Sequence, residues 1–411
     1  MSVRAMRRRA STGTGPATVR SAAEALWPAS GAISLARRPR GAPGGSAAGG
    51  GGYTTYAVVP SLRRPRYLVP RAPEVAVALR PAQGGFRGLP MLTLSYLQRW
   101  TLLHRLSARH LHVMAAPEPG GIEDLLGAVV GDVAHVVVRL GQPRPNRTLV
   151  VWAFAADGTP LAIAKVGRGE VAQAVMETEY AVLAQEPVQH VPGLVAPRAL
   201  AYVRWHGSDV LVISALVSAT GGPSHEPPVP QMRALAASRG VIAQPLRDTA
   251  FVDRLGREID ALVSQADRTW LADGLAALLR DHGDTVVRTG AWHGDWVSWN
   301  QLVAGERVLL WDWEHHASSA LAGFDHVHFL AQEQRSRGTD IRNEDLWLGD
   351  AHAVLADAWD LDGDQRSAVL RGYLLEVNLR FVRDRQLDDA PPARAGWARE
   401  LVERLTGPPQ R

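Results

Sequence analysis

The segment AWHGDWVSWNQLV holds an aspartate on an expected tight turn, Asp295, and an asparagine five residues later, Asn300. A carboxylate in such a turn could accept a proton from a hydroxyl group. The segment WDWE then adds Asp312 and Glu314 at the end of an expected strand. Amide and carboxylate oxygens are ligands that Mg²⁺ takes, with phosphates and water completing its shell. The pattern indicates proton transfer from a hydroxyl beside a site for a hard cation.

One lysine, Lys165 in the apolar run LAIAKVG, stands against 44 arginines in this chain. A lone lysine on a strand is often a solvated edge residue. Lysine presents a compact ammonium on a slim stem, whereas arginine is a wide, planar fork that would not occupy the same point. A lysine that survives where arginine is used elsewhere therefore indicates a function for the compact cation.

Taken together, HGDxxxxN followed by D[W]E resembles the catalytic and metal-binding loops of the aminoglycoside phosphotransferase and choline kinase group. The resemblance covers roughly residues 131–335. It implies that Asp295 orients or deprotonates the substrate hydroxyl and that Asn300 and Asp312 bind magnesium. Glu314 stands where that group often has a second acid, and its implied role at the metal is less direct.

The same resemblance implies roles for two further residues and for the fold. His293 would be a structural brace in the catalytic loop, and Asp325, in AGFDHVHFL, would support that loop from behind. The group has the fold of protein kinases. We therefore expect an α+β, two-lobed protein with an N-terminal antiparallel sheet that carries one helix and a mainly helical C-terminal lobe.

In this fold a lysine on the third strand contacts the nucleotide phosphates and pairs with a glutamate on the following helix. The helical stretch EVAQAVMETEYAVLAQ, after Lys165, offers Glu177 and Glu179, and Glu179 resembles the family pattern better. The turn GQPRPNRT has one glycine and no GxGxxG. Small-molecule kinases of this fold tolerate that departure, so it favours them over protein kinases.

The elements that must position these residues follow from periodicity and turn residues. The runs DVAHVVVRL and TLVVWAF and the run around Lys165 predict three strands, followed by a helix over Glu170–Gln185 and a hairpin that turns at Gly207–Ser208. This order predicts an antiparallel sheet with one helix after its third strand. Helices are expected over Thr249–Ser264, over Thr269–Asp281 and through much of Phe324–Leu405, with a hairpin between the second and the third of these stretches.

Composition divides the chain further. Residues 1–52, rich in Arg, Gly and Ala, predict a disordered tail or a start codon placed too early. Residues 53–130 form an ordered leading segment with strands at YTTYAVVP and RYLVP and a helix over Leu92–Met114. We assign residues 131–217 to a nucleotide-binding lobe and residues 218–411 to a helical lobe that carries the catalytic and metal-binding loops.

Charge and cysteine content limit the partners. Residues 1–73 carry twelve arginines and one acid, so the rest of the chain has a formal charge of −7 within a total of +4. A nucleic-acid partner is not expected, because the basic charge lies in the tail and not on the folded part. No run is long and apolar enough for a membrane-spanning helix, and no cysteine is present, so we expect a cytoplasmic protein. No motif indicates an oligomeric state.

The sequence thus predicts a phosphotransferase that uses Mg²⁺ and ATP, or another nucleoside triphosphate, on a hydroxyl of a small molecule. An alternative is a catalytically silent, nucleotide-binding module on a kinase-like fold. A third hypothesis is a metal-dependent hydrolase built on the histidine pairs His315-His316 and His326, His328, whose spacing fits solvated or core histidines better. Trp296 and Trp299 could line an acceptor pocket, although packing of the lobe explains them as well.

Overall fold

The computed structural model divides the chain into two compact units. The sheet unit comprises Met1–Tyr180 and Pro197–Ala219, and the helical unit comprises Ala181–Ala196 and Thr220–Arg411. The structure describes residues 14–28, 30, 33–37, 53–62, 64–70, 72, 74–75, 109–114, 120–140, 148–184, 188, 190–217, 222, 224–336 and 344–387.

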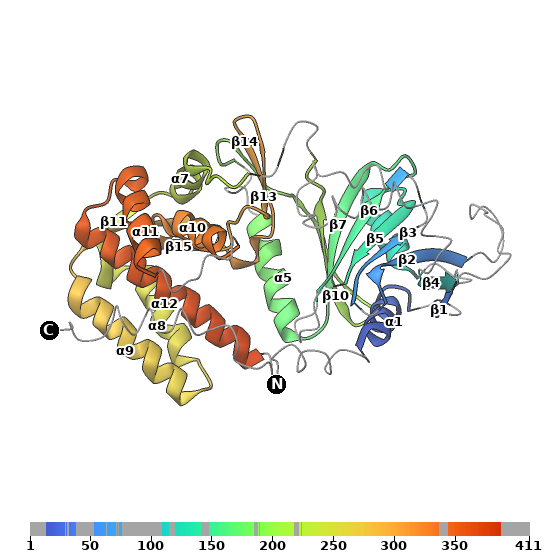
Figure 1. Ribbon diagram of the computed structural model, residues 1–411, viewed down its shortest axis with the longest axis horizontal. Helices are drawn as coiled ribbons and strands as arrows, with labels where there is room; N and C mark the ends of the chain where they lie inside the picture. Colours follow the sequence, from blue (N-terminus) through green and yellow to red (C-terminus); the bar gives the residue numbers. More distant parts are fainter. Residues whose placement is uncertain are drawn as a thin grey trace, which may run out of the picture. The chain divides into compact units, whose positions relative to one another are not determined.

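The sheet unit is built on one antiparallel sheet, for which the described residues supply nine strands in the order β1-β4-β2-β3-β5-β6-β7-β10-β9 (Figure 1). Its strands are β1 (Ile33–Arg37), β2 (Tyr53–Ser61), β3 (Arg64–Pro70), β4 (Arg109–Met114), β5 (His135–Arg139), β6 (Leu149–Phe154), β7 (Pro160–Gly167), β9 (Ala199–Trp205) and β10 (Ser208–Ser214). Within the described residues, three helices accompany them: α1 (Thr14–Leu26), α4 (Ile122–Val130) and α5 (Glu170–Leu183). The predicted strand order around Lys165, with one helix after the third strand, is confirmed.

Side chains alternate between the two faces of this sheet, as the two-residue period of a strand requires. On β7, Ala162, Ala164 and Val166 point into an apolar cluster that also contains buried side chains of α1 and α4. Ile163 points to the opposite face, where it packs with Trp152 of β6. Lys165 shares this second face because it lies two residues after Ile163. Figure 1 shows α1 and α5 on opposite sides of β10.

A glycine sets how closely α5 approaches the end of β7. A Cβ on Gly167 would lie 2.7 Å from Cβ of Ala172 and 3.0 Å from Cε of Met176, both on α5. Only a residue without a side chain allows the helix to start this close to the strand. The run LAIAKVG therefore combines a strand that turns Lys165 toward α5 with the glycine that lets the helix come near.

The structure differs from the prediction that residues 1–52 are disordered. Residues 14–26 form α1, and residues 33–37 form β1, which pairs with β4. The physical reason is the apolar face of α1, whose Val19, Ala23 and Leu26 are fully buried in the core of the sheet unit. Most of the remaining part of this segment lies outside the described residues.

The leading segment is part of the same sheet. The strands expected at YTTYAVVP and RYLVP are confirmed as β2 and β3, and β3 pairs with β5 through Leu68 and Val138. The helix expected over Leu92–Met114 is wrong at its end, because residues 109–114 form β4 between β1 and β2. Pairing with strands distant in sequence outweighs the local helical pattern there. Residues 92–108 lie outside the described residues.

The described part of the helical unit contains two small sheets in addition to its helices. The first has the order β11 (Ile242–Pro245), β12 (Val286–Trp292) and β15 (Ala317–Leu321), and the second has the order β13 (Gln301–Ala304), β14 (Arg307–Leu310) and β8 (Leu194–Val195). The expected hairpin is β13–β14, with Gln301 opposite Leu310. Strand β12 leads into the HGD turn, and the chain returns to pair with β12 after the hairpin. This arrangement brings both ends of the predicted catalytic segment to one place.

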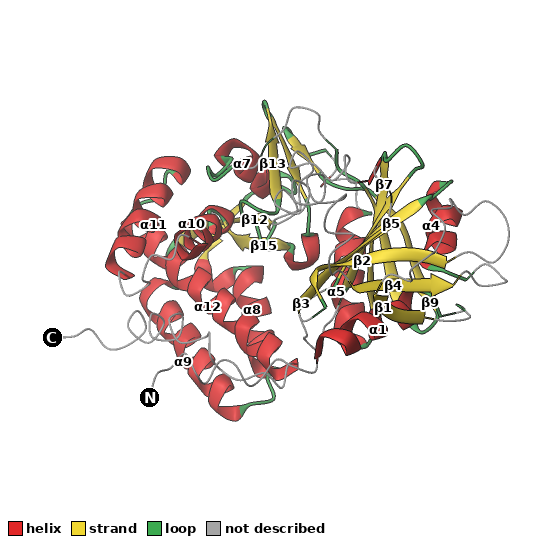
Figure 2. Cartoon of the chain, turned by 45° about the vertical axis from the view of Figure 1, so that its right-hand side comes forward, coloured by secondary structure: helices red, strands yellow, loops and turns green. Residues whose placement is uncertain are grey.

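The described helices of this unit are α7 (Val229–Ala237), α8 (Ala250–Asp260), α9 (Gln265–His282), α10 (Phe324–Ser336), α11 (Glu344–Trp359) and α12 (Gly363–Leu387), with short 3₁₀ turns η2 (Leu246–Asp248) and η3 (Trp313–His315). Helix α12 packs against α8, α9, α10 and α11 (Figure 2). The expected α+β class, with an N-terminal antiparallel sheet and a mainly helical C-terminal part, is confirmed. Among the described helices, none has the length and apolarity to cross a membrane.

Burial of α1 predicts that this helix stabilises the sheet unit. Leu26→Ala removes a fully buried side chain and should lower the free energy of unfolding by about 3 kcal/mol. Glu24→Ala, two residues earlier on the exposed side of α1, is the matched control and should change it by less than about 0.5 kcal/mol. Denaturant unfolding of the full chain measures both, and equal midpoints would show that α1 does not contribute to the core.

Candidate active site

The HGD turn of the helical unit depends on a glycine in a left-handed conformation. Gly294 has φ of +86°, and a Cβ there would lie 2.1 Å from the carbonyl oxygen of His315. The turn is held from behind by Asp325, the second residue of α10, whose two carboxylate oxygens accept the backbone N–H groups of His293 (2.8 Å) and Gly294 (3.1 Å). Arg380 of α12 donates to the carbonyl oxygen of Gly294 at 2.7 Å. Both N–H and C=O groups of the turn are thus held by side chains from α10 and α12.

Asp325 is a buried carboxylic acid, and its environment affects its charge. Burial raises the pKa of Asp325 to about 7, although the two backbone N–H groups that it accepts act in the opposite direction. Its two hydrogen bonds support the HGD turn from behind.

His293 ties the turn to the strand that follows the hairpin. Its Nδ1 accepts the backbone N–H of Asp295 at 3.2 Å, so its Nε2 carries the proton and donates to the carbonyl oxygen of Trp311 at 3.1 Å. The ring is fully buried, and burial lowers the pKa of His293 to about 3. A neutral ring with both nitrogens engaged is suited to the predicted role of a brace and not to proton transfer.

Asp295 is the half-buried acid of this turn. Its Oδ1 lies 3.1 Å from Nε2 of His328, and its Oδ2 accepts the side-chain amide N–H of Asn300 at 2.9 Å. Burial acts to raise the pKa of Asp295, but the hydrogen bond from His328 and the nearby histidine side chains act in the opposite direction and hold the pKa well below its ordinary value. Asp295 is therefore a carboxylate at neutral pH, and both of its oxygens have a fixed donor.

Asn300 is held at the base of the hairpin. Its side-chain amide nitrogen donates to the backbone carbonyl oxygen of Asp295 (3.0 Å) as well as to the carboxylate. The backbone carbonyl oxygen of Asn300 accepts the backbone N–H of Trp311 at 3.1 Å. Because the amide nitrogen faces Asp295, the amide oxygen is the atom that can meet a cation. The contact with Trp311 places Asn300 next to the residue that precedes Asp312.

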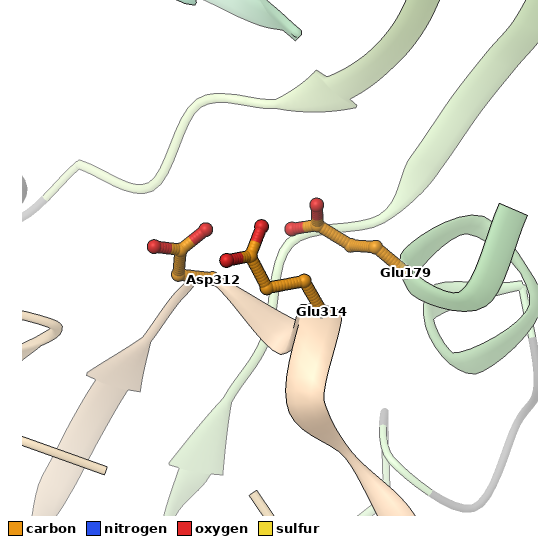
Figure 3. Close-up of side chains that lie close together, drawn as sticks. All are labelled: Glu179, Asp312 and Glu314. Atoms are coloured by element: carbon orange, nitrogen blue, oxygen red, sulfur yellow. The ribbon is translucent and has the colours of Figure 1, made fainter. Parts of the chain in front are cut away.

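Asp312 follows β14 in a left-handed conformation, with φ of 72° and ψ of 58°. Few residues other than glycine adopt it, although aspartate is among the more tolerant, and such strain is concentrated at functional sites. A carboxylate oxygen of Asp312 and one of Glu314, on η3, lie within 4.8 Å of each other, and Figure 3 shows both side chains. Two close, half-buried carboxylates repel each other unless a cation offsets their charge. Together with the amide oxygen of Asn300, they offer the oxygen ligands that Mg²⁺ prefers.

Lys165 and Glu179 form an ion pair within the sheet unit. Nζ of Lys165 lies 2.6 Å from Oε2 of Glu179, and the side chains are 10% and 0% exposed. Glu177, the other candidate partner, is exposed and accepts a hydrogen bond from Gln173 at 2.8 Å. The question left open by the sequence is thus resolved in favour of Glu179, which Figure 3 shows on α5.

Three residues at or near the HGD turn were not assigned to it from the sequence: His328, Tyr373 and Arg380. His328 could have been found, because it lies three residues after Asp325 on the same helix and so on the same side of it. Tyr373 and Arg380 lie on α12, and only tertiary packing brings that helix to the turn. Trp296 was a candidate for an acceptor pocket, but it is fully buried and donates to the side chain of Gln301 at 2.8 Å.

The histidine pairs do not form a metal site. Within the described ranges, no group of three closely spaced candidate ligands includes a histidine. His328 bonds to Asp295, and His326 accepts the indole N–H of Trp359 at 3.3 Å. Both are core histidines, and the hypothesis of a hydrolase built on them is therefore not supported.

Comparison with known proteins gives matches only in structure. No family model matches the chain, and no curated protein matches it in sequence. The chain is similar to the aminoglycoside phosphotransferase APH(4)-Ia (15% identity, TM-score 0.44), with 69% of this chain and 97% of that one covered. It is also similar to the choline kinase LicA of Streptococcus pneumoniae (12% identity, TM-score 0.45), again covering 69% and 97%.

Other structures of these two proteins contain ADP with hygromycin B and AMP, respectively. The matched proteins belong to the aminoglycoside phosphotransferase and choline kinase group, the group that the motifs around Asp295 and Asp312 resemble. At this level of similarity, neither their activities nor their substrates transfer to this chain.

The geometry of the HGD turn predicts that Gly294 tolerates no side chain. Gly294→Ala forces a Cβ onto the carbonyl oxygen of His315, whereas Gly305→Ala, also at positive φ (+62°), meets no atom within 4 Å. The control should cost roughly 1 kcal/mol of unfolding free energy, as expected for a left-handed alanine. Gly294→Ala should cost at least about 2 kcal/mol more. Denaturant titration compares them, and equal losses would contradict the close packing of this turn.

Proposed function

We propose that the protein is a phosphotransferase that uses a nucleoside triphosphate, ATP in the first instance, and magnesium to phosphorylate a hydroxyl group of a small molecule. The observation that carries the proposal is the ion pair between Lys165, the only lysine of the chain, and the fully buried Glu179. A buried ion pair adds little net stability, so packing alone does not account for it. A lysine held in this way can contact the phosphates of a nucleotide, and this contact explains why the pair is present.

Asp295 supplies the chemistry toward the acceptor in this proposal. As a half-exposed carboxylate, it accepts the hydrogen bond of the acceptor hydroxyl, aligns its oxygen for attack and takes its proton as the new bond to phosphorus forms. The bond between the terminal phosphoryl group and the nucleoside diphosphate breaks, and the diphosphate leaves. Catalysis of this kind consists of positioning and charge neutralisation, for which the fixed donors on Asp295 are suited.

Asn300 and Asp312 are the residues that would hold magnesium, and Glu314 is the nearby second acid with a less direct role. When bound, magnesium supplies positive charge that offsets the charge of the phosphates. The proximity of two half-buried carboxylates and the amide orientation of Asn300 support this assignment. His293 and Asp325 act on the turn and not on the substrate.

The acceptor is assigned only as a class. Relatives of this fold act on several kinds of alcohol, and specificity lies in surfaces that differ among them. We therefore propose a small hydroxylated molecule, and a panel of amino alcohols, sugars and hydroxylated antibiotics is the appropriate screen.

Loss of the Asp295 carboxylate should abolish transfer. With magnesium ATP and the panel, the wild-type chain should release ADP, and Asp295→Asn should reduce the rate at least about 100-fold while ATP binding changes little. Asp284→Asn is the matched control, since that carboxylate is exposed and pairs with Arg247. Chelation of magnesium should also stop the reaction. Binding of ATP without ADP release from any compound would instead support the silent nucleotide-binding module.

Two glutamates on α5 provide a matched test of the nucleotide step. Glu179→Gln leaves the Lys165 ammonium without its counter-charge and should weaken ATP binding about tenfold, or roughly 1.4 kcal/mol. Glu177→Gln changes an exposed side chain and should leave the Kd unchanged. Lys165→Arg should impair the same step, because the guanidinium does not fit the position of the ammonium. Calorimetric titration with ATP measures all three, and equal Kd values for the two glutamine variants would contradict the assignment.

A further inference from the structure

A histidine outside the expected site residues touches the acid of the HGD turn. His328 lies on α10 with 3% of its surface exposed, and its Nε2 is 3.1 Å from Oδ1 of Asp295. On the other side of the ring, its Nδ1 is 3.0 Å from the hydroxyl oxygen of Tyr373 on α12. The three groups form a hydrogen-bonded row that runs from α12 through α10 to the turn.

The direction of these hydrogen bonds follows from the chemistry of the groups. An ionised carboxylate only accepts, so Nε2 of His328 carries a proton and donates a hydrogen bond to Asp295. In a neutral imidazole Nδ1 then accepts, and its donor is the hydroxyl of Tyr373. Burial raises the pKa of Tyr373, which keeps that hydroxyl protonated and able to donate. Tyr373 thus fixes the tautomer of His328 that serves Asp295.

This row ends inside the protein and does not lead a proton to solvent. Tyr373 is 1% exposed, and its ring lies among those of Phe324, His328 and Trp347. The row is therefore suited to holding the carboxylate and not to carrying away the proton that it receives. The second oxygen of Asp295 is held by Asn300, so the two donors together prevent rotation of the carboxylate.

We propose that His328 is a positioning residue, which, oriented by Tyr373, fixes the Asp295 carboxylate in the direction from which it meets the acceptor hydroxyl. The inference rests on the proposed function and adds to it a residue pair on α10 and α12. A carboxylate that is free to rotate would meet the hydroxyl in the productive orientation only part of the time, and small misplacements of this kind cost up to about 100-fold in rate.

The kinetic test uses the full chain with magnesium ATP and measures ADP release with water as the only acceptor. His328→Leu should lower kcat by about 10- to 100-fold and leave the KM for ATP unchanged. His328→Gln should recover part of the loss, because its amide N–H can still donate to Asp295. Tyr373→Phe, which removes one hydroxyl, should give a smaller loss. These losses should occur without a matching change in unfolding free energy.

A neighbouring histidine serves as the control. His326 lies two residues earlier on α10, is buried to a similar degree and bonds to Trp359 instead of Asp295. His326→Gln should retain the wild-type kcat. An unchanged kcat in His328→Leu, or an equal loss in His326→Gln, would overturn the proposal.

A spectroscopic measurement separates this inference from the proposed function. Long-range ¹H–¹⁵N spectra report the tautomer of each histidine ring, and the signal that disappears in His328→Gln identifies His328. The wild-type ring should carry its proton on Nε2, and Tyr373→Phe should give a mixture of tautomers. If the wild type releases no more ADP than Asp295→Asn, the proposed function fails, yet these spectra still report on the row. A ring protonated on Nδ1 alone in the wild type overturns the inference whatever the activity.

Discussion

The geometry of the HGD turn depends on one buried carboxylate, that of Asp325. Its two oxygens accept consecutive backbone N–H groups, of His293 and Gly294, and so fix the path of the chain as it leaves β12. Gly294 can then adopt a conformation closed to other residues, and Asp295 emerges half exposed. A turn without secondary structure of its own would otherwise leave buried N–H groups unsatisfied, at a cost of about 1–3 kcal/mol each.

The two units use different means to hold a charged side chain in place. In the sheet unit, the two-residue period of β7 turns Lys165 away from the apolar cluster, and Gly167 lets α5 bring Glu179 to it. In the helical unit, the charge of Asp295 is held by donors from its own hairpin and from α10. Strand periodicity and the neighbouring helix suffice to position Lys165, whereas the position of Asp295 depends on several elements that are distant in sequence.

This difference explains how much could be predicted from the sequence. The strands around Lys165 and the hairpin between Asn300 and Asp312 are local features, in which periodicity and turn residues act over short distances. The partner of Lys165, Glu179, was predicted from the resemblance to the kinase group. Tertiary packing decides that residues 14–26 and 33–37 fold as α1 and β1 and that residues 109–114 form a strand. It also brings Tyr373 and Arg380 to the turn. No local pattern encodes those contacts, and a composition rich in Gly and Ala concealed the apolar face of α1.

The pairing of β3 with β5 has a consequence for how the chain can be divided. Leu68 and Val138 are opposite each other there, and the N–H of Leu140 bonds to the carbonyl oxygen of Arg66 at 2.8 Å. A shortened chain that began at the strands around Lys165 would present β5 as an uncovered edge with unpaired N–H and C=O groups. Such edges promote aggregation between molecules. The leading strands therefore cover the edge of the sheet that carries Lys165, and a chain without them should be less soluble.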